Sequence, residues 1–184
     1  MELEEAKAKF VQAWGRLGSG WGINRTMAQV HVLLLVSPEA LTADEIMKEL
    51  KISRGNANMN LRMLIDWGLI QRLHKPGERK EYFEAEKDMW TVFRQIVKER
   101  RRRELQPIFK VLEELKQVKG DRKDPSVKAF VDTLEGIHGF ASKTDSAMQI
   151  FIMADENWFL KSFMKLMQSN FRCALSWKER SRNL

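Results

Sequence analysis

Residues 53–67 carry side chains whose chemistry suits the edges of DNA bases. Asn56 and Asn58 each offer a carboxamide that can pair bidentately with adenine. Arg62 can pair with guanine or with a phosphate, and Met59 can contact a thymine methyl group. The apolar residues of this segment, which recur at helical spacing, are Ala57, Leu61, Leu64 and Ile65. The segment therefore predicts a recognition helix that buries one face and presents the other, polar but not acidic, to a major groove.

A basic turn follows this helix. Lys75-Pro76-Gly77-Glu78 has Pro and Gly at the two central positions of a turn, between a strand at 69–74 and a returning strand at 79–85. We expect its tip, residues 74–80, to reach phosphates or the minor groove beside the recognition helix. The basic side chains of this wing are His74, Lys75, Arg79 and Lys80. Residues 51–82 hold seven Lys/Arg and three Asp/Glu, so the positive charge is concentrated at this surface.

Two capped helices must hold this surface in place. Thr42-Ala43-Asp44-Glu45 is a capping box, because the threonine hydroxyl can accept from the Glu45 amide while the Glu45 carboxylate reaches back. It predicts a helix over 43–50. Ser53 is the N-cap expected for the recognition helix, with Arg54 at the same end, and both are counted among the DNA-binding residues. Helix, turn, helix and hairpin in this order predict a winged helix-turn-helix at residues 23–87.

Two further helices are expected upstream. Apolar residues recur at helical spacing within residues 1–22, which predicts an amphipathic dimerisation helix that the glycines from Gly15 onward should break. These apolar residues are Leu3, Ala6, Phe10, Ala13 or Trp14, and Leu17. Thr26 and Gln29 form a second capping box that begins an apolar helix ending at Val36. Arg25, beside it, is expected to contact a phosphate, the equal alternative being a surface arginine with no partner.

Residues 88–184 are expected to be helical and to complete a homodimer. A long helix is predicted from Asp88 to about residue 119, with a kink or break at Pro107. Its basic run, residues 98–103, is most simply a solvated helix surface. The alternatives are contact with DNA that flanks the operator, or with acidic groups of a partner subunit. Later helices are predicted around residues 130–137 and 159–171. Their apolar residues can instead fill the core of a monomer.

Aromatic residues near the end of the chain are candidates for the walls of an effector pocket. They are Phe151, Trp158, Phe159 and Phe163. A cationic ligand would be favoured over their ring faces. The alternative is that they belong to the core.

The composition of the chain limits its class. Its 184 residues are 43% hydrophobic and 31% charged, and the longest apolar run, residues 30–36, is far shorter than the roughly 20 residues of a membrane span. One cysteine, Cys173, excludes an internal disulfide framework and fits a reducing compartment, so a cytoplasmic location is expected. The net charge of +7 favours an anionic partner. The fold class is therefore mainly α with a small β-hairpin.

No catalytic or metal-binding pattern is present in the sequence. The three histidines, His31, His74 and His138, lie far apart, and none has the spacing of a metal site or of a catalytic triad with Cys173. His31 lies in an apolar segment and is most simply a core residue. We therefore expect neither an enzyme nor a bound cofactor or metal.

Several segments of the first hundred residues together resemble the GbsR branch of the MarR-type transcriptional regulators. The segments that carry the resemblance are residues 21–29, 37–38, 41–46, 52–61, 66–69 and 74–83. The resemblance implies a bacterial dimeric regulator that binds a pseudo-palindromic operator, usually as a repressor and sometimes under the control of a small ligand. Members linked to osmoprotectant metabolism sense choline-like molecules. No ligand residues are carried over, because the resemblance fades beyond about residue 105.

The sequence thus favours a sequence-specific regulator of transcription, a homodimer that binds double-stranded DNA. The alternative is a winged-helix scaffold for other proteins, with only nonspecific affinity for nucleic acid. The two classes differ in one measurable property, since a regulator binds one duplex far better than random DNA.

Overall fold

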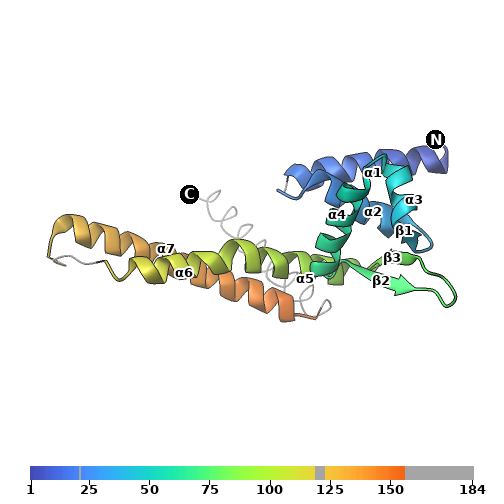
Figure 1. Cartoon of the computed structure of the whole chain (residues 1–184). Coiled ribbons are helices and arrows are strands. Elements are labelled where there is room, and N and C mark those ends of the chain that lie inside the picture. Colours follow the sequence, from blue (N-terminus) through green and yellow to red (C-terminus); the bar gives the residue numbers. More distant parts are fainter. Residues whose placement is uncertain (21, 119–122, 156–184) are drawn as a thin grey trace, which may run out of the picture. The chain divides into compact units, whose positions relative to one another are not determined.

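The computed structural model describes residues 1–20, 22–118 and 123–155, and the chain divides into two compact units between residues 96 and 97 (Figure 1). In chain order the elements are α1 (Leu3–Gly20), α2 (Arg25–Val36), β1 (Leu41–Thr42), α3 (Ala43–Leu50), α4 (Arg54–Asp66), β2 (Ile70–His74), β3 (Glu81–Ala85), α5 (Met89–Arg100), the π-helical η1 (Arg101–Leu105), α6 (Gln106–Leu115) and α7 (Pro125–Met153). The expected class, a mainly helical winged helix-turn-helix with a small hairpin, is confirmed.

Glycines bring α1 close to α2. A Cβ atom added at Gly15 would lie 2.7 Å from Cγ of Gln29, and one added at Gly18 would lie 2.6 Å from Cβ of Ala28. The prediction that glycines break this helix is therefore wrong for Gly15 and Gly18, which are needed for their small size inside the helix. Gly22, with φ +73°, does form the turn that follows.

The cap of α2 also differs from the sequence prediction. Asn24 is the N-cap, and its side-chain oxygen accepts a hydrogen bond from the Met27 amide at 3.1 Å. The predicted capping box of Thr26 and Gln29 is wrong, because the helix already begins at Arg25 and the side-chain amide of Gln29 binds another residue. It donates to Oε1 of Gln12 on α1 at 3.1 Å.

The predicted start of α3 is confirmed atom by atom. The Glu45 amide donates to the Thr42 hydroxyl at 3.3 Å, and the Glu45 carboxylate accepts from the Thr42 amide at 2.7 Å. These bonds to Thr42 lower the pKa of Glu45, with the nearby Lys80 and Lys75 adding a smaller electrostatic effect. The N-terminus of α3 is thus fixed by its own sequence.

α4 is fixed at both ends by local sequence. The Ser53 hydroxyl accepts from the Asn56 amide at 3.3 Å, as predicted for the N-cap. The helix ends at Asp66, and Gly68 with φ +68° turns the chain into β2. The start and end of the predicted recognition helix therefore agree with α4 to within one residue.

The three strands form an antiparallel sheet in the order β1-β3-β2. Ile70 pairs with Ala85 and His74 with Glu81, so the hairpin closes around the turn at residues 75–78. In that turn Gly77 has φ +81° and the Glu78 amide donates to the Lys75 carbonyl at 3.1 Å. The returning strand begins at residue 81 rather than 79.

Lys87 ties the end of the hairpin to α2. Its Nζ donates to the carbonyl oxygens of Leu34, Leu35 and Ser37 at 2.8 to 2.9 Å. A cation that pairs with the last carbonyls of a helix is favoured by the helix dipole. Lys87 therefore anchors the base of the wing.

One core holds the winged-helix elements together. It is built from α2, α3, α4, both hairpin strands and the start of α5. Its buried members are Met27, Val30, Leu34, Ile46, Leu61, Leu64, Trp67, Leu69, Ile70, Phe83, Ala85 and Val92. Leu61 and Leu64 of α4, and Trp67 directly after it, belong to this core. Because one face of α4 is buried there, its opposite face is held towards the solvent.

The second unit is helical in the part that is described. Pro107 lies in the first turn of α6, and α5, η1 and α6 follow one another without a non-helical residue. The long helix is thus not broken at Pro107, and the five residues of η1 before it are π-helical. α7 is a single 29-residue helix that packs against α6 and η1, and it extends well beyond the predicted 130–137. No helix in the described ranges is long and apolar enough to cross a membrane. The helix predicted at 159–171 lies outside the described residues.

Candidate DNA-binding surface

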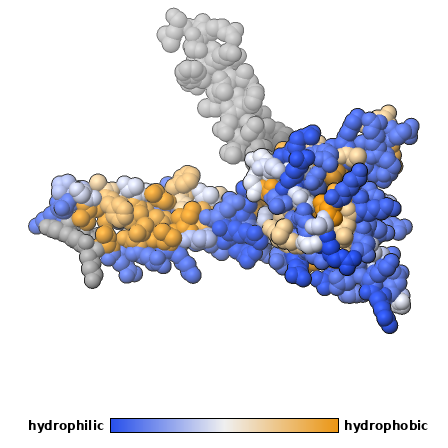
Figure 2. Space-filling view, turned by 45° about the horizontal axis from the view of Figure 1, so that its top comes forward, coloured by the Kyte–Doolittle hydropathy of each residue, from blue (hydrophilic) through white to orange (hydrophobic). Residues whose placement is uncertain are grey.

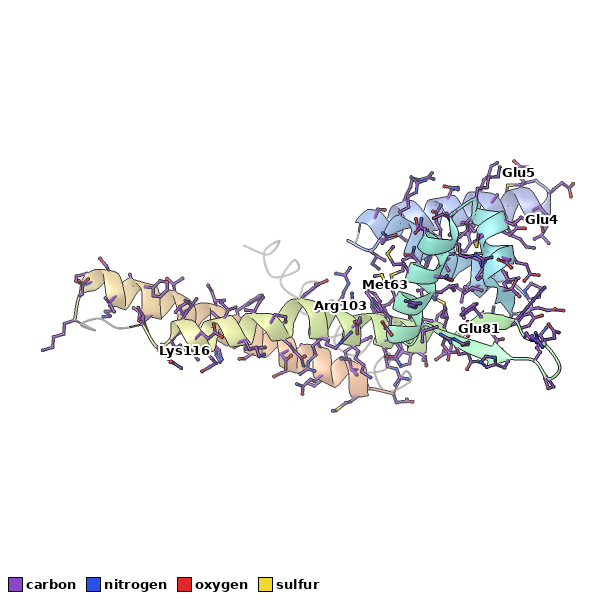
Figure 3. All side chains as sticks on the ribbon, in the orientation of Figure 1. Glu4, Glu5, Met63, Glu81, Arg103 and Lys116 are labelled. Carbon is purple, nitrogen blue, oxygen red and sulfur yellow. The ribbon has the colours of Figure 1, made fainter. Side chains whose placement is uncertain are left out.

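The exposed face of α4 presents the residue types that the sequence singled out. Asn58 and Arg62 are exposed, and Met59 is 49% exposed. Met63, labelled in Figure 3, is half-buried on the same helix. The opposite face is buried, and its members are Ala57, Asn60, Leu61 and Leu64. α4 thus has the two faces that a helix lying in a DNA groove requires.

Two adjoining hollows lie between α4 and the hairpin. One, of about 190 Å³, is lined by residues that include Arg54, Asn58 and Lys80. The other, of about 260 Å³, is lined by residues that include Asn58, Arg62 and Arg72. The fold therefore brings predicted DNA-binding residues of the helix and the wing to one continuous surface. Arg72 was not predicted, because its place in a strand gave no sign that it faces the helix.

The wing tip is exposed and partly ordered by its own contacts. Lys75 Nζ lies 4.2 Å from the centre of the Tyr82 ring, a cation–π contact. The Tyr82 hydroxyl donates to the Glu78 carboxylate, and this bond raises the pKa of Tyr82. Arg72, in the middle of β2, pairs with Glu81 at the start of β3 at 2.8 Å. Glu81 is labelled in Figure 3. The four predicted basic side chains of the wing, His74, Lys75, Arg79 and Lys80, are all exposed.

Three other predicted DNA-binding residues have partners within the protein. Ser53 caps α4 through its hydroxyl. Arg54 donates to Asp44 of α3 at 2.9 Å, with both side chains about 70% exposed. Arg25 donates to Gln12 of α1 at 2.9 Å, so it is not the unpartnered surface arginine that was considered. A Cβ atom added at Gly15 of α1 would also lie 3.2 Å from Cγ of Arg25. Arg25 therefore contacts α1, and its contact with a phosphate stays a prediction.

Comparison with known proteins bears on what such a surface is for. Residues 21–81 match the MarR family. These residues form a MarR-family domain. Their range covers α2, the capped helix pair and the wing, so the family match falls on the elements that build the surface described above. The predicted relation to MarR-type regulators is confirmed for this domain.

Two characterised proteins share part of this chain. A protein of Mycobacterium tuberculosis named HTH-type transcriptional regulator MmpR5 is 41% identical over 84 residues, which are 45% of this chain and 51% of that protein. A protein of Bacillus subtilis named HTH-type transcriptional repressor GbsR is 25% identical over 112 residues, which are 61% of this chain and 62% of that protein. The chain thus spans about half to three-fifths of each. The name of the B. subtilis protein agrees with the predicted resemblance to the GbsR branch.

A solved structure shares the fold. It is titled as the crystal structure of a transcriptional regulator, and it matches with a TM-score of 0.53 and 23% identity over 78% of this chain and 98% of that one. At this identity the likeness concerns the fold alone. The match extends beyond residues 21–81, so part of the helical segments outside the MarR-family domain also has a counterpart.

A buried histidine lies close to the end of α4. His31 of α2 is 4% exposed, and burial lowers its pKa to about 4. It lines a cavity of about 50 Å³ with otherwise almost entirely apolar walls, among them Leu64 and Trp67 at the end of α4. No group in the described residues bonds its Nε2 atom. The prediction of a core histidine is confirmed, and the cavity is far smaller than a typical ligand pocket.

The predicted effector pocket falls mostly outside the described residues. Phe151 is half-buried in the last turn of α7. Trp158, Phe159 and Phe163 lie outside the described ranges, so the pocket stays a prediction.

The basic run of residues 98–103, which follows the MarR-family domain, forms ion pairs with acidic side chains of the same chain. Glu99 is 6% exposed and accepts from Arg102 and Arg103. Arg101 forms a two-bond ion pair with Asp145 of α7, at 2.7 and 3.0 Å. These bonds lower the pKa of both carboxyl groups. Residues 98–103 were expected to be a solvated helix surface. Three of their arginines, Arg101, Arg102 and Arg103, instead pair with carboxylates of the same chain.

Proposed function

We propose that this protein is a transcriptional regulator that binds a specific DNA sequence through α4 and the wing. The observation that carries the proposal is the surface on which Asn58, Arg62, Arg72 and Lys80 meet around two adjoining hollows. It belongs to a MarR-family domain, and relatives of that domain are named regulators and repressors of transcription. By analogy with the B. subtilis relative, repression is the expected mode.

In the proposed complex, helix and wing have different tasks. α4 lies in the major groove, where Asn58, Met59 and Arg62 contact base edges. The wing, residues 74–80, lies against the phosphates or in the minor groove, where its cations add affinity with little sequence information. Arg54 exchanges Asp44 for a phosphate. The protein carries out this activity in the cytoplasm, where bacterial DNA lies.

We further propose that the protein binds DNA as a homodimer. Two recognition helices must be held about 34 Å apart to read a pseudo-palindrome, and a single winged helix cannot do this. Figure 2 shows apolar side chains gathered over α6 and α7. The exposed large apolar residues there are Ile108, Val111, Leu115, Phe130, Ile137, Phe140, Ile150 and Met153. A surface of this kind is typical of a protein interface, and a second copy of this chain supplies an equally apolar face.

The N-terminal helix supplies a second apolar strip. Leu3, Phe10 and Leu17 of α1, which were expected on a dimerisation helix, are exposed because the side of α1 against α2 is its glycine side. In the proposed organisation, α1 and residues 88–184 form the dimer, and residues 23–87 bind DNA. A small effector, if it acts, binds the dimerising part, where the predicted aromatic residues lie.

Selection from a random duplex library tests the proposed function. The full-length protein is used to enrich bound duplexes, and the winner is titrated against a scrambled duplex at about 50 and 200 mM salt. We expect an inverted repeat with half-sites about one helical turn apart, bound at least about a thousandfold more tightly than the scramble. Absence of any enriched sequence would refute the proposal and favour the scaffold alternative.

A further inference from the structure

Asn60 is a polar residue at the centre of the buried face of α4. Its relative exposure is 0%. Its Nδ2 donates to the backbone oxygen of Asn56 at 2.8 Å and to the side-chain Oδ1 of Asn56 at 2.6 Å. Its own Oδ1 has no hydrogen-bond partner among the described residues. A buried acceptor without a partner disfavours the folded state. Asn60 is therefore poorly explained as a residue kept for stability.

The backbone oxygen settles which way both amides point. A carbonyl oxygen can only accept, so the atom of Asn60 that lies 2.8 Å from it must be the nitrogen. The same nitrogen lies 2.6 Å from the end of the Asn56 side chain, and that end must also be an acceptor. The Asn56 carboxamide is thus held with its oxygen towards Asn60. Its oxygen is therefore engaged by Asn60, and the groups that point away from Asn60 are the two hydrogens of its Nδ2.

Asn56 is placed where such donors can be used. It lies in the first turn of α4, is half-buried, and has its backbone amide occupied by the Ser53 cap. The N-terminal residues of a recognition helix are the ones that contact base edges in the major groove. An asparagine that offers both donors and acceptors pairs with adenine, whereas one restricted to donation fits an edge with two acceptors, such as N7 and O6 of guanine.

We propose that Asn60 is a positioning residue that makes Asn56 a donor-only reader of guanine. This inference rests on the proposed function, and it revises the expected pairing of Asn56 with adenine. Asn60 touches no DNA in this scheme. It acts through Asn56, because without it the Asn56 carboxamide can rotate by half a turn and present its oxygen instead.

The test compares four full-length proteins on the operator selected by the wild type. They are the wild type, Asn56→Ala, Asn60→Leu and the double variant. Dissociation constants are measured for the operator and for every single-base change in one half-site. A well-made contact discriminates between bases by about 5- to 150-fold. We expect one guanine position at which the wild type discriminates by about tenfold or more and each single variant by less than about twofold.

The double variant separates positioning from general damage. If Asn60 acts through Asn56, the double variant discriminates no less than Asn56→Ala alone, and the other operator positions keep their wild-type preferences. Melting curves by circular dichroism check the fold. If Asn60→Leu melts at a clearly lower temperature, Asn60→Met replaces it, because an unbranched side chain adapts to an irregular site.

Three outcomes overturn the inference, and they differ from one another. Wild-type discrimination in a folded Asn60 variant, at the position that Asn56→Ala loses, would show that Asn60 does not position Asn56. An adenine at that position would contradict the donor-only reading. A wild type that selects no sequence would refute the proposed function itself, and this inference with it.

Discussion

Acidification is expected to destabilise the first unit through His31. The buried imidazole resists protonation down to a pKa of about 4, whereas in the unfolded chain it titrates near 6.5. Between these values the unfolded state binds a proton that the folded state does not. The stabilising contribution of His31 is therefore fully present above pH 6.5 and is lost as the pH falls towards 4.

The size of this effect follows from the two pKa values. At pH 5 most unfolded chains carry the proton and most folded chains do not, which removes about 2 kcal/mol of the free energy of unfolding relative to pH 8. Below pH 4 the loss levels off at about 3 kcal/mol. A loss of this size is a large fraction of the stability of a small domain.

Urea unfolding of the wild type and of His31→Leu, followed by tryptophan fluorescence from pH 8 to pH 5, measures the effect. Leucine has a similar size and removes both the titration and the unpaired Nε2 atom. The paired carboxylates with lowered pKa values lose stability on acidification in both proteins, so their contribution cancels in the difference. The gap between the two curves should change by about 2 kcal/mol. Parallel curves, with a change below about 0.5 kcal/mol, would refute the assignment of a buried neutral histidine.

Three further predictions concern other parts of the chain. Arg62→Ala should lose operator preference, whereas Lys80→Ala should weaken binding to operator and scrambled duplexes by similar factors, and equal losses on both duplexes for Arg62→Ala would contradict a base contact. Gly18→Ala should lower the free energy of unfolding by about 1–2 kcal/mol, because its Cβ would lie 2.6 Å from that of Ala28, while Gly20→Ala, in open space on the same helix, should change it by less than about 0.5 kcal/mol. Phe140→Glu, at a 74% exposed site, should shift a dimer to monomer in sedimentation equilibrium, and an unchanged mass would place the interface elsewhere. Asp132→Lys should leave the mass unchanged, because Asp132 is an exposed residue of α7 whose helical neighbours Lys128, Glu135 and Gly136 are not among the exposed apolar residues.

Features governed by neighbouring residues could be predicted from the sequence. The Thr42 and Glu45 box, the Ser53 cap and the turn at Gly77 each depend on groups within three residues, and each is found where expected. The amphipathic pattern of residues 54–66 also predicted the buried and exposed faces of α4. The recognition helix and the wing were therefore accessible from local rules alone.

Features that depend on a distant partner could not be predicted. Gly15 and Gly18 looked like helix breakers, because nothing local reveals that α2 passes within van der Waals contact of them. The bond from Arg25 to Gln12 could not be predicted, because the two residues are 13 positions apart in the sequence. Nothing in the sequence around Asn60 reveals that this polar residue is fully buried and bonded to Asn56.

The proposed DNA-binding surface combines a rigid helix backbone with side chains that can change partners. The buried face and C-terminal end of α4 are held by core residues such as Leu64, so the helix itself has little freedom. Its N-terminal end is held by an exposed pair, Arg54 with Asp44, and such pairs contribute about 0–1 kcal/mol. Arg54 can therefore leave Asp44 for a DNA phosphate at small cost. We infer that rigid backbone and replaceable surface pairs together let α4 keep its orientation while its side chains change partners on binding DNA.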